Sequence, residues 1–187
     1  QAAFVHLTLL PYIPSAGEMK TKPTQHSVKE LTGLGIQPDL LLCRTERALD
    51  PKIKQKIAHF CNVEENSVIT AQDVSTIYEV PLALHGEGLD ERIIEKLNIW
   101  TAAPNISRWE RLVTTIKGSR DCVKIAMVGK YIDLSDSYKS LNEALVHGGI
   151  ANDCGVDIVP VDSERVEAEG IVEEIRQADA ILVPMGF

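Results

Sequence analysis

The chain has 187 residues, of which 44% are hydrophobic and 25% are charged, and its formal net charge is −8. This composition is typical of a globular protein with one large domain or two small ones, and it argues against a protein that coats nucleic acid or lies on a membrane surface. The longest apolar runs, such as Leu40–Cys43, are far shorter than the about 20 residues that span a bilayer. No segment resembles a signal peptide. We therefore expect a cytoplasmic enzyme or enzyme fragment without nucleic-acid or membrane partners.

The cysteines and histidines do not have the spacing of a metal site. The five histidines form neither an HxH nor an HExxH pair, so we expect no zinc site. The cysteines are scattered and form no CxxC pair, which favours small buried side chains in a reducing compartment. They are Cys43, Cys61, Cys122 and Cys154.

The first elements are predicted to form a β-α-β unit. Phe4–Leu10 is an apolar run typical of a buried strand, and it ends before Pro11. A helical pattern begins near Val28 and stops at Gly33, and Pro38–Cys43 is a second buried strand. A strand, helix and strand of this length predict parallel pairing, with ligands outside the carboxyl ends of the strands.

Positive charge gathers between this first strand and the helix. Lys20 and Lys22 lie one residue apart, just before the helical pattern. Helix N-termini offer free N–H groups and a positive dipole end, and lysine is a common phosphate ligand. The spacing is compatible with a phosphate-recognition loop and with a solvated turn that carries ordinary surface lysines.

The end of the second strand carries another cation. Arg44 directly follows the predicted strand, where it is able to stack on a base or pair with a phosphate. The alternative is a structural ion pair with Glu46 or Asp39. Lys56 shares a helical face with Phe60 and, taken alone, would be a surface lysine.

The α/β alternation continues along the chain. Asp50 and Pro51 predict a helix start, with Ile53, Ile57 and Phe60 facing inward. Residues 68–70 predict a short third strand, and residues 71–74 lie at its carboxyl end. Residues 78–97 predict short helices with a turn at 86–88, and we expect no site there.

A second α/β unit is predicted after a polar stretch at residues 117–121, where we place a domain boundary. An amphipathic helix precedes this stretch at residues 106–116. The unit itself is too short to be a complete domain. Its predicted elements are a strand at 123–128, a helix from Tyr138 to Gly148 and Gly149, a strand at 156–161, a helix at 170–177 and a strand at 180–183.

The opening motif resembles CTP synthase. Residues 17–31, GEMKTKPTQHSVKEL, and residues 35–40, GIQPDL, closely match a signature of that family. The likeness continues through residues 60–63, 73–78, 128–131, 136–140 and 180–184, so it covers nearly the whole chain. It implies an α/β fold of mostly parallel sheet layers. Residues 1–103 would be the end of a P-loop-type synthetase (amidoligase) domain, 104–121 an interdomain helix and linker, and 122–187 the first βα units of a class I glutamine amidotransferase domain.

The resemblance also implies an activity and its sites. The family aminates UTP to CTP: ATP phosphorylates the uracil O4, and ammonia from glutamine hydrolysis displaces that phosphate. The implied UTP site, also used by inhibitory CTP, consists of Lys20, Thr21, Lys22, Pro23, Thr24, Gln25 and Lys56. The implied ATP site lies at Arg44, Gln72, Asp73 and Val74.

Other parts of the family's machinery are expected elsewhere. The ATP-binding P-loop and the acidic Mg²⁺ ligands would precede residue 1, and the glutaminase nucleophile would follow residue 187, so we expect no catalytic residue here and no activity of the segment alone. The family reads Pro-Gly-Gly-Phe-Gly where this chain has Pro184, Met185, Gly186 and Phe187, and only Gly186 is carried over, as a glutamine contact. The family also implies GTP as activator and a homotetramer. The alternative is a non-catalytic module for nucleotide-dependent regulation or for oligomerisation.

Overall fold

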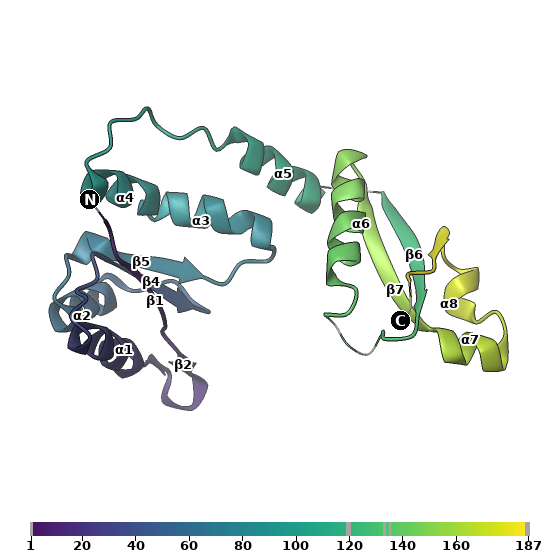
Figure 1. The fold of residues 1–187 in the computed structure, drawn as a ribbon, viewed down its shortest axis with the longest axis horizontal. Helices are drawn as coiled ribbons and strands as arrows, with labels where there is room; N and C mark the ends of the chain where they lie inside the picture. The colour runs from purple at the N-terminus through teal and green to yellow at the C-terminus, as the bar shows by residue number, and fades with distance from the viewer. Residues whose placement is uncertain (1, 119–120, 133, 135, 186–187) are drawn as a thin grey trace. The chain divides into compact units, whose positions relative to one another are not determined.

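The chain folds into two compact α/β units. The computed structural model describes residues 2–118, 121–132, 134 and 136–185. The first unit comprises residues 1–109 and the second residues 110–187. Each is built on a three-stranded parallel sheet with helices against it (Figure 1). The predicted fold class, α/β with mostly parallel strands, is confirmed.

The sheet of the first unit has the order β1-β4-β5. Its strands are β1 (Val5–Leu9), β4 (Leu40–Thr45) and β5 (Val68–Gln72). A small antiparallel hairpin, β2 (Tyr12–Ile13) and β3 (Glu18–Met19), encloses the short helix η1 (Pro14–Ala16). Because the strands are parallel, β1, β4 and β5 all end at one edge of the sheet, where the predicted site residues lie.

Helices cover both faces of this sheet (Figure 1). On one face lie α1 (Lys22–Gly33) and α2 (Pro51–Cys61), and on the other lie α3 (Val80–Gly86) and α4 (Leu89–Leu97). The 3-10 helices η2 (Glu65–Ser67) and η3 (Ile77–Glu79) precede β5 and α3. The core under α1 and α2 contains the fully buried Leu10, Leu41 and Ile57.

The predicted start of α2 is confirmed. The Asp50 carboxylate accepts a hydrogen bond from the Lys52 N–H at 2.8 Å, and Pro51 occupies the first helical turn. The inward position predicted for Phe60 is wrong, because its side chain is 61% exposed. The buried stripe of α2 runs through Ile57, Ala58 and Cys61, and at 3.6 residues per turn Phe60 lies off that stripe.

The strand β1 is buried on only one face. Thr8 points toward α1 and is buried, whereas Leu7 and Leu9 on the opposite face are about 60% exposed. The prediction of a fully buried strand is therefore wrong for alternate residues. The physical reason is that α3 packs against β5, which lies at the other edge of the described sheet.

The second unit has a sheet of order β7-β6-β8. Its strands are β6 (Cys122–Gly129), β7 (Gly155–Asp162) and β8 (Ala180–Leu182). The helix α6 (Lys139–Ala151) lies on one face, and α7 (Ser163–Glu169) and α8 (Glu173–Arg176) lie on the other (Figure 1). The helix α5 (Ser107–Gly118) spans the boundary between the two units.

Two predicted helix limits in this unit are wrong. The pair Gly148 and Gly149 does not end α6, which continues to Ala151. A Cβ atom on Gly149 would lie 2.7 Å from the Cys154 carbonyl oxygen, so this glycine allows the helix to approach the following chain closely. The helix predicted at residues 170–177 is shorter, since α8 covers only Glu173–Arg176, and a separate helix that was not predicted, α7, precedes it and ends before Gly170, whose φ is 81°.

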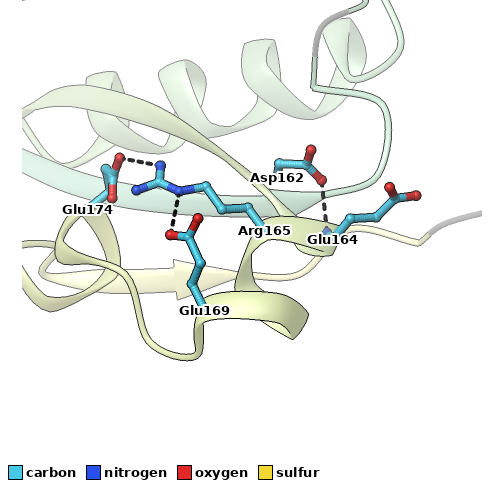
Figure 2. A network of polar contacts seen from close by, with 5 residues as sticks. All are labelled: Asp162, Glu164, Arg165, Glu169 and Glu174. Atoms are coloured by element: carbon cyan, nitrogen blue, oxygen red, sulfur yellow. Dashed lines mark hydrogen bonds and ion pairs between the residues drawn. The ribbon is translucent and has the colours of Figure 1, made fainter.

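A polar network fixes α7 beside α8 (Figure 2). The Arg165 guanidinium donates to Glu169 at 3.1 Å and to Glu174 at 2.7 Å, which ties the two helices together. The Asp162 carboxylate caps α7 by accepting from the Glu164 N–H at 2.9 Å. Arg165 and Glu169 are exposed, Asp162 and Glu174 are half-buried, and the network makes a structural contact between neighbouring helices.

The cysteines divide between the two units. Cys43 and Cys61 are buried, as predicted, and burial raises the pKa of the Cys43 thiol to about 12 and that of Cys61 to about 11. In the second unit Cys122 is exposed and Cys154 is half-buried, so the expectation of four buried cysteines is wrong. None of the helices in the described part of the chain is long and apolar enough to cross a membrane.

Candidate functional site

Lys20, the first of the predicted site lysines, directly follows the β2–β3 hairpin. The backbone N–H of Lys20 donates to the Pro11 carbonyl at 2.9 Å, which fixes the exit of the hairpin beside the end of β1. The Lys20 ammonium forms an ion pair with the Glu18 carboxylate, and both side chains are exposed. An anion that approaches Lys20 must therefore compete with Glu18.

Residues 22–25 lie in a helix, which corrects the prediction of a loop. Lys22 is the first residue of α1, and Pro23 occupies the first turn, where its missing N–H is not needed. Thr21 is the N-cap, but its side chain makes no capping hydrogen bond and instead accepts from Gln25 Nε2 at 3.1 Å. The exposed Lys22 thus lies at the positive end of the α1 dipole.

The two threonines of the motif point into the protein. Thr24 has no exposed surface: its hydroxyl donates to the Leu9 carbonyl at 3.3 Å and lies 3.3 Å from the Thr8 hydroxyl, which donates to it. Thr21 is also buried. These contacts attach the start of α1 to β1, so the two threonines position the lysines beside them.

Lys56 lies close to the same cluster. Its exposed side chain projects from α2. The pKa of Glu18 is lowered by the hydrogen bond and the charge of Lys20, and the charge of Lys56 adds to this effect. The fold therefore brings Lys20 and Lys56 toward one carboxylate, although 36 positions separate them in the chain.

The predicted ATP residues line one groove. Arg44, Gln72, Asp73 and Val74 all border a cavity of about 630 Å³ at the carboxyl ends of β4 and β5. The rest of its lining is apolar and comes from β1, β4, β5, η3 and α3, namely Leu7, Leu42, Ala71, Ile77, Val80, Ala83 and Leu84. A concave apolar surface with a few polar groups is typical of a site for a flat heterocycle.

The polar rim of this groove is an exposed ion pair. Arg44 Nε lies 3.1 Å from Asp73 Oδ1, and the two side chains are 65% and 48% exposed. This partner differs from the two weighed from the sequence, Glu46 and Asp39, and Asp39 instead accepts from the Phe4 N–H at 2.8 Å. Arg44 is also within β4, one residue before its end, because its carbonyl accepts from the Leu10 N–H.

Sequence reasoning missed two contacts near these sites. The Arg47 guanidinium lies 3.7 Å above the centre of the Tyr12 ring, which holds the start of the β2–β3 hairpin. In the turn between α3 and α4, the Glu87 carboxylate binds Lys54 and the backbone of Thr70. An acidic residue between two glycines was the only sequence signal for the second contact, and it does not reveal a partner.

The predicted glutamine contact, Gly186, lies outside the described residues. Met185 beside it is exposed and borders a small cavity with Tyr131, Leu134 and Tyr138 at the carboxyl end of β6.

The first unit thus places a lysine cluster at a helix start and an apolar groove at the same edge of a parallel sheet, an arrangement typical of nucleotide-binding α/β proteins. Comparison with known proteins gives the family. The family model described as the CTP synthase N-terminus matches residues 1–99, so the chain belongs to the CTP synthase family.

Curated relatives agree with this assignment. The chain is 60% identical to a protein named CTP synthase from Syntrophus aciditrophicus, in an alignment that covers 100% of the chain and 35% of the relative. It is 60% identical to CTP synthase from Geobacter sulfurreducens and 57% identical to that from Geotalea uraniireducens, with 98% of the chain covered in each case. The chain spans about a third of the length of these relatives.

Proposed function

We propose that this chain is a segment of a CTP synthase, a ligase that aminates UTP to CTP with ATP and with ammonia from glutamine. The observation that carries the proposal is that an exposed lysine cluster and an apolar groove lie at the same carboxyl end of the sheet of the first unit. Such a reaction needs UTP and ATP bound near one another, because ATP phosphorylates the uracil O4 before ammonia displaces the phosphate. The segment supplies binding residues for both nucleotides.

The lysine cluster is the proposed site for the triphosphate of UTP, and for that of CTP as inhibitor. Lys20, Lys22 and Lys56 supply the positive charge, and Gln25 is half-buried beside them. A charge-assisted hydrogen bond contributes about 1.5–3 kcal/mol, so two or three of them account for tight binding of a polyanion. Thr21, Pro23 and Thr24 complete the site by fixing the first turn of α1.

The apolar groove is the proposed site for the adenine of ATP. Its volume and apolar lining suit a purine ring, and Arg44, Gln72 and Asp73 offer polar groups for the ring edge or the sugar. Val74 lies among the residues that line the groove just after β5.

Residues 122–187 are proposed to begin the glutamine amidotransferase domain. One observation is compatible with this: the second unit has its own parallel sheet, beyond the residues that the family model matches. Gly186 would contact glutamine there. The Mg²⁺ ligands and the glutaminase nucleophile would belong to other parts of the polypeptide, and GTP activation and a homotetramer complete the proposal.

The test compares two exposed lysines of α1 in the full-length protein. We expect Lys22→Ala to weaken UTP binding about tenfold, which is the loss of one charge-assisted contact. Lys29→Ala is the matched control, because Lys29 is an exposed lysine of the same helix further from its positive end. Titration calorimetry with UTP measures both, and equal small effects would mean that Lys22 is an ordinary surface lysine of α1.

A further inference from the structure

The turn between α3 and α4 is attached to the sheet through one carboxylate oxygen. Glu87 Oε2 accepts a hydrogen bond from the backbone N–H of Thr70 at 2.8 Å and from Lys54 Nζ at 2.6 Å. Thr70 belongs to β5, Lys54 to α2, and Glu87 immediately follows α3. A single side chain therefore connects a strand and helices on both faces of the sheet.

The contact supplies a hydrogen-bond partner for a backbone N–H on the outer side of the edge strand β5. The strand β5 lies at the edge of the described sheet, and the Thr70 N–H donates to Glu87 instead of joining a strand ladder. Exposed strand edges leave backbone groups without partners, and Glu87 supplies one here. Partial burial acts to raise the pKa of Glu87, but the hydrogen bonds from Lys54 and Thr70 outweigh it and leave that pKa below its ordinary value.

The connected elements are two walls of the adenine groove. The residues after Thr70 along β5, Ala71 and Gln72, line the groove from the sheet. The facing wall is formed by η3 and α3 through Ile77, Val80, Ala83 and Leu84, and Glu87 comes one turn after the last of these. The Glu87 contact therefore joins the end of α3 to β5, the two elements between which the groove lies.

We propose that Glu87 is a positioning residue for ATP: by tying the end of α3 to Thr70 of β5, it holds the groove at the width that accepts adenine. The inference rests on the proposed function, because it takes the groove to be the ATP site. Glu87 itself does not line the groove and touches no part of the nucleotide. Two of the three lysines proposed for UTP, Lys20 and Lys22, lie on the hairpin exit and on α1, away from Glu87, and only Lys56 shares α2 with Lys54. We therefore expect the effect of Glu87 to fall mainly on ATP.

The experiment measures the dissociation constants of a non-hydrolysable ATP analogue and of UTP, separately, for the full-length protein and its variants. We expect Glu87→Ala to raise the constant for the ATP analogue about tenfold and to change that for UTP less than twofold, since misplaced walls weaken only the ligand between them. Glu87→Gln keeps an acceptor for the Thr70 N–H and loses only the charge, so we expect about a threefold rise. Glu91→Ala is the matched control, an exposed acidic residue in the first turn of α4 for which the described residues offer no bond to β5.

The outcomes separate this inference from the proposed function. If the wild-type protein fails to bind the ATP analogue, or binds it equally well after Arg44→Ala and Ala83→Trp, the assignment of the groove to ATP is wrong. If the wild type binds and Glu87→Ala binds equally tightly, or loses ATP and UTP affinity by the same factor, the positioning role is wrong. Should Glu87→Ala not fold, Glu87→Gln decides the question by the same comparison of the two nucleotides.

Discussion

The two proposed nucleotide sites of the first unit lie at one sheet edge but are built in different ways. The UTP site is made of long, exposed lysine side chains around the start of α1, and shape contributes little to it. The ATP site is a groove with an apolar lining and one exposed ion pair. The first suits a polyanion recognised by charge, and the second suits a flat ring recognised by shape.

The two sites should respond differently to substitutions and to salt. Charge acts over several ångströms, so lysines on separate elements cooperate without fixed geometry, and salt screens them. An apolar groove depends on the spacing of its walls, so residues that never touch the ligand affect binding. We expect the UTP site to be sensitive to charge and ionic strength, and the ATP site to volume and wall position.

The largest expected effect comes from removing two charges at once. Lys20→Ala combined with Lys22→Ala should weaken UTP binding about 100-fold, because each charge-assisted contact contributes about 1.5 kcal/mol or more. ATP binding should change less than threefold. Titration calorimetry in 50 and 200 mM salt measures both, and the salt dependence of UTP binding should become shallower in the variant. A parallel loss of ATP affinity would show that the two sites are not separate.

A substitution in the groove should weaken ATP binding and leave UTP binding nearly unchanged. Ala83→Trp places a large ring where α3 faces β5, and we expect it to weaken ATP binding about 30-fold by filling the space of the adenine. UTP binding should stay within about twofold. The matched control is Ala58→Trp, which enlarges a buried residue of α2 away from the groove and should lower thermal stability instead. Unchanged ATP affinity in Ala83→Trp would show that adenine does not bind in the groove.

Much of the fold followed from local sequence signals. Apolar runs predicted the strands, Asp50 and Pro51 predicted the start of α2, and the alternation of elements predicted parallel sheets. These signals are local, because the apolar runs are short, are bounded by turn residues and alternate with helical patterns. The placement of the candidate residues at the carboxyl edge of the sheet followed from the same reasoning.

The errors occurred where tertiary contacts decide. The polar side chain of Arg44 suggests that the strand has ended, yet Arg44 is still in β4, since it pairs with Leu9 of β1 and with Ala71 of β5. The apolar pattern begins only at Val28 and therefore predicts a loop at Lys22, but a proline in the first turn allows α1 to start earlier. Glu87 carried no signal, because its partner Thr70 is 17 residues away and contributes a backbone group.

The acid stability of the first unit should depend on Glu87. Its pKa is lower in the folded protein than in the unfolded chain, so its stabilising contribution is fully present above its ordinary value of 4.5 and is lost as the pH falls through the lowered value. Glu87→Gln removes this titration, and we expect it to lower the free energy of unfolding by about 1 kcal/mol at neutral pH and by less in acid. Urea unfolding at pH 7 and pH 3.5 measures both, with Glu91→Gln as control. An equal loss at the two pH values would mean that the Glu87 charge does not stabilise the fold.

The smallest expected effect is a gain in UTP affinity, whereas the preceding binding predictions are losses. Glu18 pairs with Lys20 and therefore competes with an incoming phosphate for the same ammonium group. We expect Glu18→Gln to tighten UTP binding about threefold, because an exposed ion pair is weak and only its competition with the phosphate is removed. ATP binding should not change, since Glu18 does not line the groove. Glu30→Gln is the matched control, an exposed acidic residue of α1 far along the helix from its positive end. Weaker UTP binding in Glu18→Gln would mean that the carboxylate orients Lys20 for the ligand, and the UTP site would then depend on geometry as the groove does.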